Sequence, residues 1–246
     1  MFQFTFIKTL FLITLAGTLL AAISLSLFLP RNASLIKIAQ SDLNDNSLSE
    51  TYLLTSGRLF ITEDQKELWT TPPGWRVDNF ALADINNDGL VDLILSLWKS
   101  GSFGSSRPFW ITKNDPSIKN HFFIFDLVGS TLKMIWGSSN LAAPNCEFQI
   151  SSLGSAAQNY LVVLEGDYAD RTQCSGRYIA VWYWNGWGFS HLWRSPQGHF
   201  TNLKVEATGS QNQIVVDSNQ GPLRLPVDFI LEAEDTASTE KALKDH

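Results

Sequence analysis

The chain has 246 residues, enough for one substantial core or at most two small domains. Hydrophobic residues make up 44% of the chain and charged residues 17%, a balance that is typical of a globular protein and excludes a wholly disordered one. The net charge of −6 argues against a nucleic-acid partner, because phosphate binding needs a basic surface.

The first thirty residues form a separate segment. Thr9–Leu29 contains no charged residue, and about 20 apolar residues are enough to span a bilayer. With Lys8 on the inner side, we expect residues 1–30 to be an uncleaved signal anchor. This transmembrane helix would place the rest of the chain outside the cytoplasm as a single-pass membrane protein. The alternative is a cleaved signal that releases a secreted domain, but the apolar run is long and its end lacks a small-x-small cleavage site.

The chain beyond this segment has the pattern of strands. Between residues 35 and 230, short runs rich in Val, Ile, Leu, Phe and Tyr are separated by Gly, Asn, Ser and Pro. No stretch there has the 3.6-residue apolar period of a helix. The predicted fold class is therefore all-β. The clearest runs are residues 51–55, 58–62, 93–98, 121–127, 159–166, 178–184 and 213–217.

An internal repeat organises these runs. Ser41–Leu54 aligns without a gap with Ala83–Ser96, and a tryptophan ends a strand-like run at Trp69, Trp136 and Trp193. Repeats of about 40–60 residues with four strands each are typical of a β-propeller. We expect a small propeller of about four blades, each of four antiparallel strands, within residues 31–232. The four repeats run over residues 35–71, 75–136, 146–193 and 199–232.

The fourth repeat is the least regular of the four. Its strands are predicted at residues 200–206, 213–217, 222–227 and 228–233. The remaining residues, 233–246, are charged and lack an apolar pattern, so we expect a disordered tail.

The second repeat carries an acidic loop between its first two strands. Alternating oxygen-bearing side chains converge when such a loop curls, and Gly89 permits the sharp turn. Calcium takes six to eight oxygen ligands, and three carboxylates with an amide suit it better than magnesium. The alternative is an Asx-rich turn without a metal. The predicted ligands are the side chains of Asp84, Asn86, Asp88 and Asp92 and the carbonyl of Leu90.

This loop begins like an EF-hand, but its twelfth position is Leu95, inside a strand-like run rather than between helices. The pattern Asp-x-Asn-x-Asp-Gly-x-x-Asp, followed by residues 93–98, instead resembles the calcium loops of FG-GAP and VCBS-type repeats, as in the integrin α-subunit propeller. The resemblance implies that the loop links strands A and B of a blade. We expect its Ca²⁺ to be structural, because the ligands are used in holding the turn.

The first repeat carries a degenerate copy of the same loop. Asn46 and Ser47 stand where Asp-Gly is expected, which removes one carboxylate and the permissive glycine. We therefore expect a weaker second metal site. Its predicted ligands are Asp42, Asn44, Asn46 and Glu50.

The chain contains two cysteines, Cys146 and Cys174. In an exported domain they predict one disulfide that closes a loop of about 30 residues. Two free buried thiols are the alternative. Zinc binding is disfavoured because no Cys-x-x-Cys or paired histidine accompanies them.

Antiparallel strands sort the loops onto two faces, with the acidic loops on one and the longest insertions on the other. Long loops on a rigid scaffold usually carry function, and aromatics beside amides and carboxylates suit a sugar or a peptide. For any single tryptophan, packing between blades is the alternative interpretation. The predicted ligand-binding residues are Trp98, Lys99, Arg107, Trp110, Glu165, Asp167 and Tyr168.

These features predict a membrane-anchored, extracytoplasmic, calcium-binding β-propeller. It would act as a binding or scaffolding module for a glycan or protein ligand, with no catalytic residue assigned. The alternative is a hydrolase or lyase acting on a polysaccharide, with Glu165 and Asp167 as acid and base. Nucleophile, P-loop, dinucleotide and zinc-hydrolase motifs are absent from the sequence.

Overall fold

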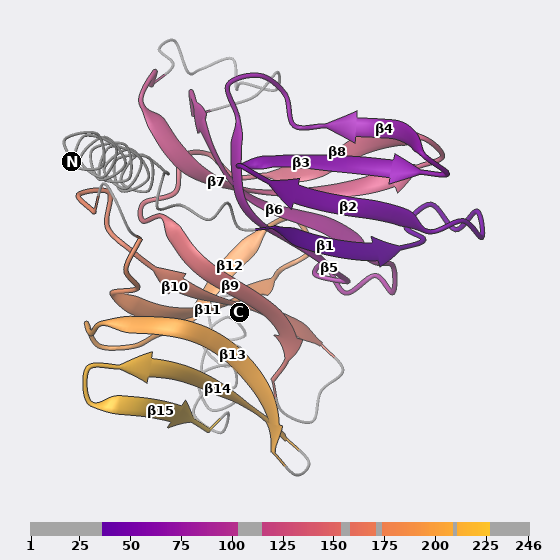
Figure 1. The fold of residues 1–246 in the computed structure, drawn as a ribbon. Helices are drawn as coiled ribbons and strands as arrows, with labels where there is room; N and C mark the ends of the chain where they lie inside the picture. The colour runs from indigo at the N-terminus through magenta and orange to yellow at the C-terminus, as the bar shows by residue number, and fades with distance from the viewer. Residues whose placement is uncertain (1–35, 103–114, 154–157, 171–173, 209–210, 227–246) are drawn as a thin grey trace, which may run out of the picture. The chain divides into compact units, whose positions relative to one another are not determined.

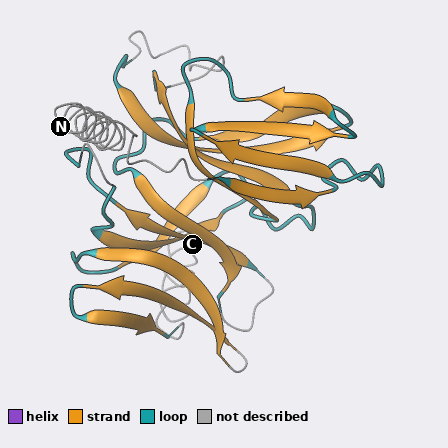
Figure 2. Cartoon of the chain, viewed as in Figure 1, coloured by secondary structure: helices purple, strands orange, loops and turns teal. Residues whose placement is uncertain are grey.

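The computed structural model describes residues 36–102, 115–153, 158–170, 174–208 and 211–226 (Figure 1). The chain divides into two units, Met1–Leu35 and Ile36–His246, and only the second contains described residues. Strands are the only regular elements in these ranges (Figure 2), so no helix there is long and apolar enough to cross a membrane. The predicted anchor at residues 1–30 and the predicted tail at residues 233–246 lie outside the described residues.

The strands form four antiparallel sheets, each ordered as in the chain. The first contains β1 (Lys37–Ser41), β2 (Glu50–Thr55), β3 (Arg58–Glu63) and β4 (Lys66–Thr70). The second contains β5 (Arg76–Ala83), β6 (Asp92–Ser100), β7 (Ile118–Val128) and β8 (Thr131–Gly137). The third contains β9 (Asn145–Ser152), β10 (Asn159–Glu165), β11 (Tyr178–Trp184) and β12 (Phe189–Arg194). The fourth contains β13 (Phe200–Thr208), β14 (Gln211–Ser218) and β15 (Gly221–Leu225).

These sheets confirm the all-β prediction and the four repeats, and they form a four-blade, propeller-like arrangement. Radial repetition of this kind leaves only short sheet edges. Three strands of the fourth sheet lie where the sequence predicts them. Its predicted last strand, residues 228–233, lies outside the described part of the chain.

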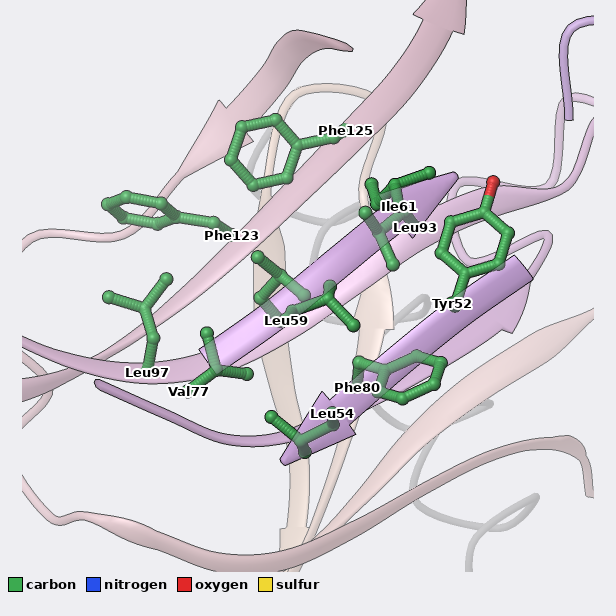
Figure 3. Close-up of a cluster of buried hydrophobic side chains, with 11 residues drawn as sticks. Tyr52, Leu54, Leu59, Ile61, Val77, Phe80, Leu93, Leu97, Phe123 and Phe125 are labelled. Atoms are coloured by element: carbon green, nitrogen blue, oxygen red, sulfur yellow. The ribbon is translucent and has the colours of Figure 1, made fainter. Parts of the chain in front are cut away.

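Successive sheets are joined by buried apolar side chains. In the first sheet, alternate residues of β2 and β3 face β5 and β6, so that Tyr52 and Leu59 pack with Phe80 and Leu93 (Figure 3). A second cluster joins the second and third sheets, and a third cluster joins the third and fourth. Within the described ranges, no such cluster joins the first sheet to the fourth.

Cys146 and Cys174 form a disulfide with a Cα–Cα distance of 5.1 Å, which confirms the predicted pairing. The bond ties the start of β9 to the loop that follows β10. Gly166 lies directly against it: a Cβ atom there would be 2.5 Å from the Cys146 Sγ and 2.9 Å from the Cys174 Sγ. The bridge therefore needs a residue without a side chain at position 166.

Candidate ligand cleft and metal loops

The predicted metal loop of the second repeat joins β5 to β6. Its first aspartate organises the turn, because Asp84 Oδ1 accepts the Asp88 N–H at 3.1 Å and Oδ2 accepts the Gly89 N–H at 2.9 Å. Asp92 closes the loop, its Oδ2 accepting the Ile85 N–H at 3.3 Å. The loop is thus held by carboxylates that accept backbone hydrogen bonds.

The loop of the first repeat has the same hydrogen bonds 42 positions earlier. Asp42 accepts the Asn46 N–H at 3.1 Å and the Ser47 N–H at 2.8 Å. Glu50 Oε2 accepts the Leu43 N–H at 2.9 Å, as Asp92 does in the other copy. The repeat seen in the sequence is therefore also a repeat of local structure.

The carboxylate, amide and carbonyl oxygens of the second loop are of the chemical type that calcium prefers as ligands. Asp92 is 2% exposed, and burial, together with the negative charges of Asp88 and Asp84, raises its pKa to about 7. A divalent cation would favour its ionised form, and a carboxylate oxygen that accepts one N–H keeps a second lone pair for a metal. Among the described residues, however, no group of three or more His, Cys, Asp or Glu converges closely enough to hold an ion. The metal remains a prediction.

The first loop contains a buried carboxylate and an additional neighbour. Glu50 is fully buried, its Oε2 lies 3.3 Å from the Tyr52 hydroxyl, and its Oε1 has no hydrogen-bond partner. The side-chain amides of Asn44 and Asn46 both donate to Glu63 Oε1, at 3.0 and 2.8 Å. Sequence reasoning missed Glu63, because it is the last residue of β3 and lies outside the repeat pattern.

A cleft of about 840 Å³ lies on the face that carries the loops between blades and the loop after β10. Aromatic rings form much of its wall: Trp98 meets Tyr168 edge to face, with ring centroids 5.7 Å apart. The described residues that line it are Gly74, Trp75, Arg76, Asp78, Trp98, Ile118, Pro144, Asp167, Tyr168, Asp170 and Cys174.

Hydrogen bonds and charges hold Trp98 in place. Its indole N–H donates to Asp78, and the Arg76 guanidinium lies 5.3 Å from the centre of its ring. Arg76 also pairs with Asp78 at 3.1 Å. Burial raises the pKa of Asp78, an effect that Arg76 and Trp98 oppose. Sequence reasoning missed Arg76 and Asp78, which alternate on β5 directly after Trp75.

Tyr168 and Asp167 are equally fixed in the lining of the cleft. The Tyr168 hydroxyl donates to the Leu141 carbonyl at 2.8 Å, and the Lys119 ammonium lies 3.9 Å from the centre of its ring. Asp167 pairs with Arg177 at 2.9 Å. The aromatic surface of the cleft is therefore organised before any ligand binds.

The predicted ligand-binding residues divide into three groups. Trp98, Asp167 and Tyr168 line the cleft together. Glu165 lines a different cavity. Lys99 is buried, and its ammonium donates to the Gly101 carbonyl at 2.6 Å, so Lys99 is absent from the wall of the cleft. The other two, Arg107 and Trp110, lie outside the described residues.

No protein-family model matches this chain, and no curated protein sequence matches it. The resemblance to FG-GAP and VCBS-type repeats therefore remains an expectation from the Asp84–Asp92 loop. The propeller-like arrangement of the sheets agrees with that expectation at the level of architecture alone.

Proposed function

We propose that this chain is a membrane-anchored, extracytoplasmic, calcium-binding β-propeller of the FG-GAP/VCBS type, which binds a glycan or protein ligand in the cleft around Trp98 and Tyr168. The apolar segment of residues 1–30 would supply the anchor. The Asp84–Asp92 loop would hold the calcium ion, and the Asp42–Glu50 loop a weaker one. In this proposal the metal has a structural role on the face away from the ligand.

One observation carries the proposal: the end of β6 and the loop after β10 bring Trp98, Asp167 and Tyr168 into one aromatic cleft. Aromatic faces stack on sugar rings or on apolar side chains, and neighbouring carboxylates accept hydrogen bonds from hydroxyls and amides. Fixed aromatic walls also lower the conformational entropy lost on binding.

The arrangement favours a binding module over a hydrolase. A glycosidase needs two carboxyl groups on either side of one scissile bond. Glu165 pairs with Arg194 at 2.7 Å in one cavity, whereas Asp167 pairs with Arg177 and lines the cleft. The two candidate carboxylates therefore do not face a common space.

A glycan array and an array of displayed peptides, both screened with the full-length chain, test the proposal. Ile118, 66% exposed at the start of β7, lines the cleft, whereas Val128, 56% exposed at the end of the same strand, does not. We expect at least one ligand class to bind, Ile118→Arg to weaken that binding at least tenfold, and Val128→Arg to leave it unchanged. Equal binding by the two variants, or turnover of a bound glycan, would contradict the proposal.

A further inference from the structure

A second, smaller cavity lies between the second and third sheets. Its volume is about 420 Å³, within the range of small-molecule sites. Phe122 and Trp136, from β7 and β8, form one wall. Trp182 and Phe189, from β11 and β12, line it from the third sheet, with Leu161 of β10. Most of the lining side chains are thus apolar, and the polar ones are Asn145, Glu165, His191 and Arg194.

The register of the third sheet sets which of its side chains face the cavity. Leu161, Trp182 and His191 lie side by side across three strands, and the next row contributes Val163 and Arg194 to the lining. Edge-to-face contacts, such as Trp136 with Phe189 at 5.3 Å, fix the aromatic rings of the lining.

Polar groups gather at one end of the cavity. Asn145 and Glu165 are paired in register on β9 and β10, and Glu165 is 8% exposed. Arg194 reaches across to Glu165 at 2.7 Å, while its guanidinium stacks 3.7 Å from the centre of the Tyr178 ring. The buried carboxylate is therefore already neutralised by a cation whose position is fixed.

This end of the cavity selects against charge in a ligand. A ligand carboxylate would compete with Glu165 for Arg194, and a ligand ammonium would compete with Arg194 for Glu165. Either would leave one partner of the pair without its counter-charge, and the loss is greater for Glu165, whose carboxylate is buried, than for Arg194, which is partly exposed. An uncharged hydroxyl or amide can hydrogen-bond to the pair or to Asn145 and leave the pair intact.

We propose that this inter-sheet cavity binds a small neutral amphiphile: a planar aromatic body that carries an uncharged hydroxyl or amide group. The aromatic walls enclose the ring, and the polar group meets Asn145 and the Glu165–Arg194 pair. The site is separate from the cleft around Trp98, so it does not depend on the function proposed above.

Four ring-matched probes test this specificity by calorimetry on the full-length chain. They are 4-methylphenol with a neutral hydroxyl, toluene with no polar group, 4-methylbenzoate with a negative charge and 4-methylbenzylamine with a positive charge. We expect 4-methylphenol to bind, to bind tighter than toluene, and to bind at least tenfold tighter than either charged probe. Absence of 4-methylphenol binding, or preference for a charged probe, would overturn the proposal.

Two substitutions locate the binding. Ala142 is exposed and lines the rim of the cavity, whereas Ala207 is exposed on β13, outside the lining. Ala142→Trp should block the entrance and weaken 4-methylphenol binding at least tenfold without changing the core, and Ala207→Trp should leave it unchanged. Equal binding by Ala142→Trp and the unaltered chain would place the probe elsewhere and refute the assignment.

Discussion

Ser47 takes in the first loop the place that Gly89 takes in the second. The two residues have φ angles of 69° and 89°, and each donates its backbone N–H to the Oδ2 atom of the first aspartate of its loop. The loop conformation is therefore kept although the glycine is lost. Ser47 adopts the left-handed region that L-residues occupy at a cost of about 1–2 kcal/mol.

This relationship predicts opposite effects of two substitutions. Ser47→Gly should raise the free energy of unfolding by up to about 1 kcal/mol, because the strain is relieved but glycine has more freedom to lose on folding. Gly89→Ala should lower it by about 1 kcal/mol through backbone strain alone, since nothing lies within 4 Å of the added Cβ. Chemical denaturation measures both. If both substitutions destabilise equally, the two loops do not share the conformation described.

Acid should destabilise the fold through His121. This residue is fully buried on β7, and burial, together with the nearby Lys99 charge, lowers its pKa to about 4, although its hydrogen bond to the Ser138 carbonyl opposes the shift. The unfolded chain, with a histidine pKa near 6.5, binds more protons between pH 6.5 and 4. Stability from His121 is thus complete above pH 6.5 and lost toward pH 4, by about 3 kcal/mol for a shift of this size.

Denaturation curves recorded from pH 7.5 to 4 measure this loss when the unaltered chain is compared with its variants, because the raised pKa of Asp92 acts in the opposite direction over the same range in all of them. The His121→Asn variant, which keeps a side-chain donor, should lose the part of the pH dependence that belongs to His121. The matched His191→Asn variant changes an exposed histidine on β12 and should retain the pH dependence that belongs to His121. Identical pH profiles for His121→Asn and the unaltered chain would refute the assignment.

The disulfide should contribute about 3–4 kcal/mol to the free energy of unfolding. This is the free energy that corresponds to the chain entropy lost when a loop of 28 residues is closed in the unfolded chain. Replacing both cysteines with alanine should lower the free energy of unfolding by about that amount. Reductant should have no effect on the stability of the double variant. A loss under about 1 kcal/mol would show that the bridge constrains little.

Gly166 and the disulfide should be energetically coupled. An added methyl group at position 166 would meet both sulfurs, so Gly166→Ala should cost about 1–3 kcal/mol in the oxidised chain. In the Cys146→Ala/Cys174→Ala background the same substitution should cost much less, because the obstructing sulfurs are gone. A double-mutant cycle measures this coupling, and additive costs would contradict the contact.

The architecture was largely predictable from the sequence because its signals are local and repeated. The spacing of 42 residues between Asp42 and Asp84 indicates the repeat, and the short apolar runs at β6 and β10, bounded by turn residues, predict strands. The disulfide followed from the number of cysteines and their place near one end of the sheet.

The candidate site was predictable only in part, because alternation and loop paths decide which side chains meet. Glu165 and Asp167 are two residues apart, yet β10 ends at Glu165 and the chain turns away, so the carboxylates face different cavities. Lys99 is polar and follows Trp98, but β6 continues to Ser100 and carries Lys99 into a buried position. Neither outcome has a signal in a short stretch of sequence.

The most direct test of the account is a calcium titration of the full-length chain after treatment with chelator. Calorimetry should show binding, and millimolar calcium should raise the melting temperature, with a gain in stability of about 2.7 kcal/mol at a hundredfold excess over Kd. Asp84→Asn should abolish the tighter binding event, whereas Glu67→Gln, which removes one charge from an exposed position on β4, should preserve it. Absence of both binding heat and any thermal shift at millimolar calcium would contradict the central claim.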